Sequence, residues 1–168
     1  RSKIKIPWAM SCNRHFVTET RNSESLQNEF AEILLKFLAL NAPSNDNEQA
    51  ADTSAAEFCS SFIRACSDKV VNMPQFNDPY EQLSQIISRL NPDSITLPDI
   101  AQVFSIIELV HTYVDIWELT AETIEGLIDW VLYIALKTKG SVLLQYTCHD
   151  LLHSIIIRNI DNISVIIR

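Results

Sequence analysis

Apolar residues recur at intervals of three and four from Thr96 to Arg158, and this periodicity predicts three consecutive amphipathic helices. We expect these helices to run from about Pro98 to Asp115, from Ala121 to Lys139 and from Val142 to Arg158. Turns of a few residues separate them, so neighbouring helices must run antiparallel and lie side by side. The pattern therefore predicts an all-α fold of stacked antiparallel helix pairs.

The residues at the expected helix ends support these boundaries. Thr96, Thr120 and Ser141 each precede a helix, where a side-chain hydroxyl can accept a hydrogen bond from an unpaired backbone N–H. Pro98 suits an opening turn because it has no N–H to leave unpaired. Gly140 is expected to end the second helix by adopting a left-handed conformation.

Three further helices are predicted upstream. The first covers about Ser23–Leu40, and the second begins at a cap on Thr53 and ends near Val71. The third begins after Asp78, with Pro79 at its first position, and ends near Leu90. The polar residues between the first two, 41–52, predict a loop.

The spacing of the last three helices resembles that of a known architectural class. Their starts at Pro98, Ala121 and Val142 lie 23 and 21 residues apart. One helix pair therefore takes up a length within the range of about 40–47 residues found for HEAT and armadillo repeats. From about Asp78 to Arg168 the chain resembles this HEAT/armadillo-like class, which implies a stacked fold and a scaffold role. No residue pattern repeats between pairs, so an irregular helical bundle is the alternative.

The chain divides into two parts. Residues 1–22 carry several basic residues without a helical period and are expected to form an irregular N-terminal arm. Residues 23–168 are expected to form a single helical domain, cut from a larger protein. An uncapped stack exposes its packing face at the C-terminal end. The apolar residues there are expected either to fold back or to meet a missing neighbour or a second copy; they are Ile163, Val165, Ile166 and Ile167.

Charge is distributed unevenly along the chain. No lysine or arginine lies between Arg89 and Lys137, and the formal net charge of the chain is −8. A surface of this sign disfavours direct nucleic-acid binding and favours a basic protein segment. The alternative is that the acids only keep the protein soluble. The acidic residues of this segment are Asp93, Asp99, Glu108, Asp115, Glu118, Glu122, Glu125 and Asp129.

One helix combines these acids with aromatic residues. Glu122, Glu125, Asp129 and Tyr133 fall opposite the apolar side of the helix from Ala121, and Trp130 lies nearby. Carboxylates beside aromatic rings can hold a lysine or arginine side chain through charge and cation–π attraction. In the alternative interpretation, the two aromatic residues pack on a neighbouring helix with their polar tips outward. Gly126 would suit close packing or an approaching ligand backbone.

A single short string suggests metal chemistry. His149 and His153 are four residues apart on one predicted helix, and Asp150 follows the first, as in the zinc-binding pattern H-E-x-x-H. Aspartate is shorter than the usual glutamate, and no third ligand is evident. We therefore expect the string to pack against a neighbouring helix, together with Tyr146, Ile156 and Ile157. His111 and Asp115 are likewise expected to form a pair on the helix surface.

Composition excludes several other functions. The chain has two glycines, too few for a phosphate-binding loop, and no apolar run long enough to cross a membrane. Its four cysteines form no C-x-x-C pair, and Cys59, Cys66 and Cys148 fall on apolar helix faces. With no signal peptide evident, an intracellular location, cytoplasmic or nuclear, is expected.

These observations predict a protein-protein interaction scaffold, part of a larger assembly, with no cofactor and no enzymatic activity. The expected partner is a helix or basic segment of another protein, bound in grooves between helices, or a second copy bound at the open end. The alternative is a helical metal-dependent hydrolase that uses His149, Asp150 and His153.

Overall fold

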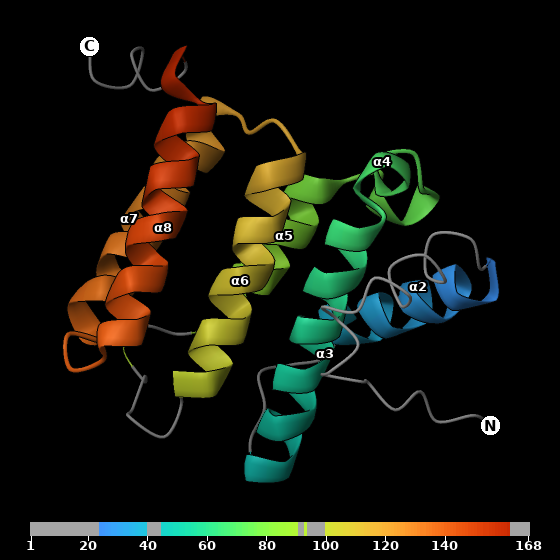
Figure 1. The fold of residues 1–168 in the computed structure, drawn as a ribbon, viewed down its shortest axis with the longest axis horizontal. Coiled ribbons are helices and arrows are strands. Elements are labelled where there is room, and N and C mark those ends of the chain that lie inside the picture. The colour runs from blue at the N-terminus through green and yellow to red at the C-terminus, as the bar shows by residue number, and fades with distance from the viewer. Residues whose placement is uncertain (1–23, 40–44, 91–92, 94–99, 162–168) are drawn as a thin grey trace.

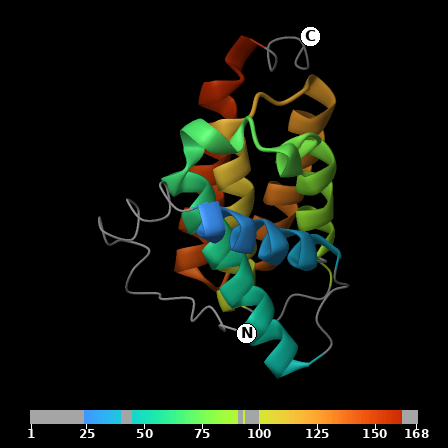
Figure 2. The same cartoon turned by 90° about the vertical axis from the view of Figure 1, so that its right-hand side faces the viewer.

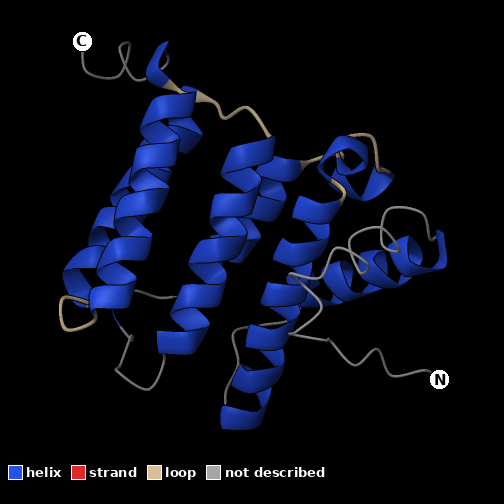
Figure 3. Cartoon of the chain, viewed as in Figure 1, coloured by secondary structure: helices blue, strands red, loops and turns tan. Residues whose placement is uncertain are grey.

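The computed structural model describes residues 24–39, 45–90, 93 and 100–161. All regular secondary structure in these residues is helical (Figure 3), which confirms the predicted all-α class. The N-terminal arm and the C-terminal isoleucines lie outside the described residues. The elements are α2 (Glu24–Ala39), α3 (Asp46–Ala65), α4 (Ser67–Val70), the 3-10 helix η2 (Pro74–Phe76), α5 (Pro79–Ser88), α6 (Ile100–Ile116), α7 (Ala121–Lys137) and α8 (Val142–Arg158).

The helices form two layers. Helices α3, α6 and α8 lie side by side in one layer, and α5 and α7 pack behind α6 and α8 (Figure 1). The pair that the sequence predicts from α6 and α7 is not formed as expected, since α6 packs mainly against α3, α5 and α8 and α7 packs against α8. Helix α2 differs because it crosses the α3 end of the stack obliquely and contacts both α3 and α5 (Figure 2).

Helix α6 is the centre of the molecule, since it packs against α3, α5 and α8. The sequence predicts a single apolar stripe on this helix, but burial extends around most of its circumference. Ser105 and Thr112 are fully buried, and their hydroxyls donate to the carbonyls of Gln102 and Glu108 at 2.8 Å. Small hydroxyl side chains can be buried here because the helix itself supplies their acceptors.

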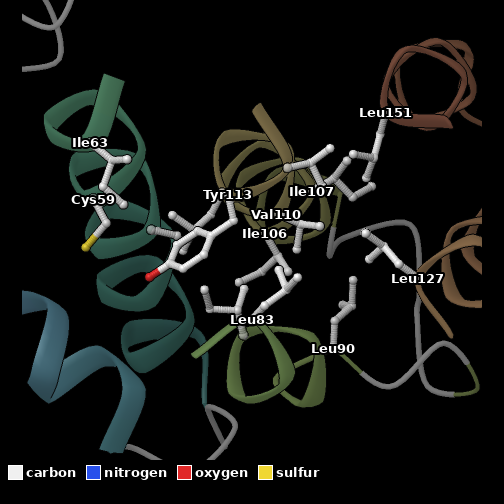
Figure 4. Packing of buried hydrophobic residues seen from close by; sticks show 14 of the residues in the cluster. Cys59, Ile63, Leu83, Leu90, Ile106, Ile107, Val110, Tyr113, Leu127 and Leu151 are labelled. Carbon is white, nitrogen blue, oxygen red and sulfur yellow. The ribbon is translucent and has the colours of Figure 1, made fainter. Parts of the chain in front are cut away.

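Aromatic residues join the helices at the N-terminal end of the core. The rings of Phe30 on α2 and Phe62 on α3 are stacked with centroids 3.6 Å apart. Tyr113 of α6 lies between α3 and α5 (Figure 4), and its buried hydroxyl donates to Gln82 Oε1 at 2.9 Å. At the other end the core is completed by Leu127 of α7 and Leu151 of α8, both buried.

Several predicted helix ends are confirmed. Asp78, Thr120 and Ser141 each accept a hydrogen bond from the backbone N–H three residues later. The predicted loop over 41–52 is wrong beyond residue 45, because α3 begins at Asp46 with Asn45 as its cap. Thr53 lies inside α3, and its hydroxyl donates to the carbonyl of Gln49 at 2.8 Å. The alanines and the acidic residues of this stretch favour a helical first turn, which its polar composition concealed.

Two other local predictions are wrong. The helix expected to continue to Val71 ends at Ala65, and the short α4 follows it. Gly140 does not take a left-handed conformation, since no described glycine has a positive φ. The last backbone bond of α7 instead comes from the cap residue Thr138, whose N–H donates to the carbonyl of Ile134 at 2.9 Å.

Candidate functional site

The outer side of the last described helix pair, α7 and α8, carries no further helix among the described residues. Helices α7 and α8 are joined by a short turn and run antiparallel (Figure 1). Gln145 of α8 fixes their alignment, because its amide donates to the carbonyl of Ala135 at 2.7 Å. Both helices bury one face, which leaves the opposite faces open. The buried residues are Ile124, Leu127, Val131 and Ile134 on α7, and Leu144, Cys148, Leu151 and Ile155 on α8.

The open side of α7 carries a straight stripe, here called the α7 stripe. Its members are spaced by three and four residues, so they follow one line along the helix. The two leucines in it are 51% and 53% exposed. The stripe is acidic in its N-terminal half and apolar in its C-terminal half. It consists of Glu122, Glu125, Asp129, Leu132 and Leu136.

The three acids of the α7 stripe point to the open side of the helix. Glu122, Glu125 and Asp129 are exposed, as the sequence predicts. None of the three makes a side-chain hydrogen bond or ion pair with another residue of the described ranges. Asp115, earlier in the acidic segment, differs because its carboxylate lies 3.1 Å from the guanidinium of Arg64.

The aromatic residues beside these acids are already engaged. The Tyr133 hydroxyl donates to Asp93 Oδ1 at 2.5 Å, and this hydrogen bond is the main reason that the pKa of Tyr133 is raised. Lys137 lies over the Tyr133 ring, 5.3 Å from its centroid, so a cation of this chain already occupies that face. Trp130 is half-buried against the core. Its indole N–H is buried without a hydrogen-bond partner among the described residues, rather than directed outward.

Helix α8 carries a second open stripe, here called the α8 stripe. The spacing alternates between three and four residues, and an acid and a histidine occupy its centre. The sequence favoured packing for Tyr146 and Ile157, but they are 67% and 59% exposed. The neighbouring Ile156 is exposed as well. The stripe consists of Leu143, Tyr146, Asp150, His153 and Ile157, and the exposed Ile160 follows beyond the end of α8.

Exposed apolar residues are concentrated on this helix pair. Of the twelve large apolar residues that are exposed in the described part of the chain, nine lie on α7, on α8 or in the turn after α8. Sequence periodicity could not find them, because an apolar face has the same pattern whether or not a neighbour covers it. Gly126 also lies on this side, and a Cβ added there would meet no atom within 4 Å. It is therefore not a close-packing position.

The histidines have different surroundings. The expected packing of the string against a neighbouring helix is wrong for His149 and His153, because both are exposed. The described residues contain no group of three or more potential metal ligands. His111 is half-buried between α6 and α8, where its Nε2 lies 2.7 Å from Ser154 Oγ and 3.6 Å from Asp115 Oδ2. The pair of His111 and Asp115 therefore belongs to a contact between helices.

Comparison of the chain with protein-family models, with curated proteins and with solved structures returned no match. Within the described ranges, no helix combines the length and the hydropathy that crossing a bilayer requires. The function of the chain therefore has to be inferred from the open surfaces of α7 and α8.

Proposed function

We propose that the chain is a protein-protein interaction module, and that its α7 stripe binds a basic helical segment of another protein. The observation that carries this proposal is the combination of three exposed carboxylates and two exposed leucines on one line of α7. A folded domain rarely leaves large apolar side chains together at the surface unless a partner covers them.

The stripe specifies the chemistry of the partner. A partner helix that lies along α7 would place apolar residues against Leu132 and Leu136. Its lysines or arginines would meet the carboxylates of Glu122, Glu125 and Asp129 in the other half. The acidic half and the apolar half of the stripe must be matched by the same partner helix. The order of basic and apolar residues along that helix therefore sets its orientation on α7.

The overall charge of the chain supports the same partner. With a net charge of −8, the protein attracts basic segments at long range and accelerates their encounter. Exposed ion pairs add little affinity individually. Most of the binding free energy should therefore come from covering the leucines, while the acids select the partner and its direction.

Matched charge reversals test the proposal. The test variant replaces Glu122, Glu125 and Asp129 with lysine, and the control replaces Glu24, Glu29 and Glu32 of α2 with lysine. Both variants change the net charge equally and leave the buried residues intact. Quantitative affinity capture should recover specific partners with the wild type and the control, and lose them with the test variant. A second variant, Leu132→Asp with Leu136→Asp, should lose the same partners.

Two results would contradict the proposal. One is recovery of every partner by both test variants, because the α7 stripe would then not contact them. The other is equal loss with the α2 control, which would attribute binding to net charge alone. Circular dichroism of each variant should match the wild type, because none of the substituted residues is in the core.

A further inference from the structure

The α8 stripe has a symmetry that the α7 stripe lacks. Four of its residues are arranged symmetrically about a midpoint between Leu151 and Leu152, with Asp150 on one side of the midpoint and His153 on the other. Tyr146 and Ile157 follow in the two directions at the same distance. When a second α8 helix is placed antiparallel to the first, apolar residues therefore face apolar residues, and the acid of each helix faces the histidine of the other.

We infer that the α8 stripe is an interface for a second copy of this chain, with two α8 helices packed antiparallel about a two-fold axis. In a two-fold interface, each residue meets its counterpart across the axis reciprocally. The axis would pass through the midpoint of the stripe. Asp150 would then meet His153 of the second copy, and Tyr146 would meet Ile157.

Charge selects the antiparallel arrangement. Asp150 and His153 are exposed and make no side-chain hydrogen bond or ion pair with other described residues, so both are available across the interface. In the antiparallel arrangement the two-fold axis creates two carboxylate–imidazole contacts. A parallel arrangement would instead oppose Asp150 to Asp150, which is unfavourable because like charges repel.

The stripe also suits helix-helix packing. Spacings of three and four residues are those of the seam between two packed helices. The apolar members at both ends are large and exposed, as Tyr146 and Ile157 illustrate. The two polar contacts lie at the centre of the interface. A shift of register would bury Asp150 and His153 without polar partners, which is costly. The stripe therefore specifies one register.

This inference is independent of the partner proposed for the α7 stripe, because it rests on different side chains. The two ideas are also compatible, since a dimer formed through α8 would carry two α7 stripes. Loss of self-association would not alter the affinity-capture result expected from Glu122, Glu125 and Asp129, and the reverse also holds.

Sedimentation equilibrium of the full chain tests the inference, at concentrations up to the order of 1 mM. The wild type should form a dimer. Asp150→Lys and His153→Glu should each weaken it about tenfold, and the double variant should restore it through the exchanged charges. Ile157→Asp should weaken it about 30-fold or more. The control is Leu35→Asp on α2, an apolar residue as exposed as those of the interface, which should leave the dimer intact.

The outcomes are decisive. A wild type that remains monomeric overturns the inference, and so does a dimer that is insensitive to Ile157→Asp. A dimer that the single charge variants weaken but the double variant fails to restore overturns the antiparallel register. Restoration of the dimer in the double variant supports this register, because nonspecific association would not depend on which residue carries which charge.

Discussion

The Nε2 atom of His111 on α6 lies 2.7 Å from the Ser154 hydroxyl oxygen on α8, at the boundary where the last helix pair meets the centre of the stack. Asp115, one turn further along α6, lies within 3.6 Å of the same nitrogen and binds Arg64 of α3. Polar side chains thus connect the three helices of one layer along a line. His111, which the sequence predicts to pair with Asp115 on the surface of one helix, instead joins two helices.

Removing the serine hydroxyl should destabilise this boundary. We expect Ser154→Ala to lower the free energy of unfolding by about 1 kcal/mol relative to Ser84→Ala, because His111 loses a partner in a half-buried site. Ser84 is an exposed residue of α5, so the two variants gain the same helix propensity. Urea denaturation measures the difference. Equal midpoints for the two variants would show that the contact contributes nothing.

A buried ion pair joins α3 to the end of α5, and its loss should be costly. The Arg89 guanidinium binds Asp52, donates to the carbonyl of Phe37 at 3.0 Å and lies over the Phe37 ring. Asp52→Ala leaves the arginine buried without its counterion, which should cost about 3–5 kcal/mol. Asp115→Ala breaks the more exposed pair with Arg64 and should cost about 1 kcal/mol or less. Thermal unfolding of both variants gives the comparison.

Helix ends could be predicted because they depend on local chemistry. Asp78, Thr120 and Ser141 cap helices through their own side chains, and nothing distant is needed to place them. Asn45 caps α3 by the same mechanism, with its side chain accepting from the N–H of Glu48 at 2.9 Å. That signal was present in the sequence but was outweighed by the polar composition around it.

The candidate site was only partly predictable. The exposure of Glu122, Glu125 and Asp129 followed from helical periodicity, since these residues oppose an apolar face. The exposure of the apolar residues of α8 could not be predicted from periodicity, because Tyr146 and Ile157 would be buried if another helix lay beyond them. Whether a neighbour exists depends on where the stack ends. That is a property of the tertiary arrangement and leaves no periodic signal.

Buried thiol and phenol groups should make the protein sensitive to alkali. Burial raises the pKa of Cys148 from its ordinary 9.0 to about 11, and it also raises the pKa of Cys59 and Tyr113. The unfolded chain therefore releases these protons at a lower pH than the folded protein does. The contribution of these groups to the free energy of unfolding is fully present below pH 9 and is lost as pH rises toward 11. Urea midpoints measured from pH 7 to pH 10.5 should show this fall. Cys148→Ala should reduce the slope, whereas an unchanged slope would contradict the assignment.

Replacing Gly126 with alanine should stabilise the protein. This glycine lies in the interior of α7, where it gives flexibility to the unfolded chain, and a Cβ there meets no atom within 4 Å. The expected gain is about 1 kcal/mol, measured by thermal unfolding. Gly140→Ala should also be tolerated, since no described glycine has a positive φ. Strong destabilisation by either change would mean that the glycine is required for its backbone conformation.

Salt should affect the two proposed interactions in opposite directions. A basic segment bound to Glu122, Glu125 and Asp129 is attracted by charge, so its Kd should rise as salt screens that attraction. Two copies of a chain with net charge −8 repel each other, and screening removes this repulsion. The dimer formed through the α8 stripe should therefore tighten between 50 and 500 mM salt, a range over which the screening length shrinks from about 14 Å to about 4 Å. Sedimentation measures the dimer, and titration with a captured basic partner measures the other Kd. If both constants moved in the same direction, one of the two surfaces would be wrongly assigned, and the stripe variants would identify which.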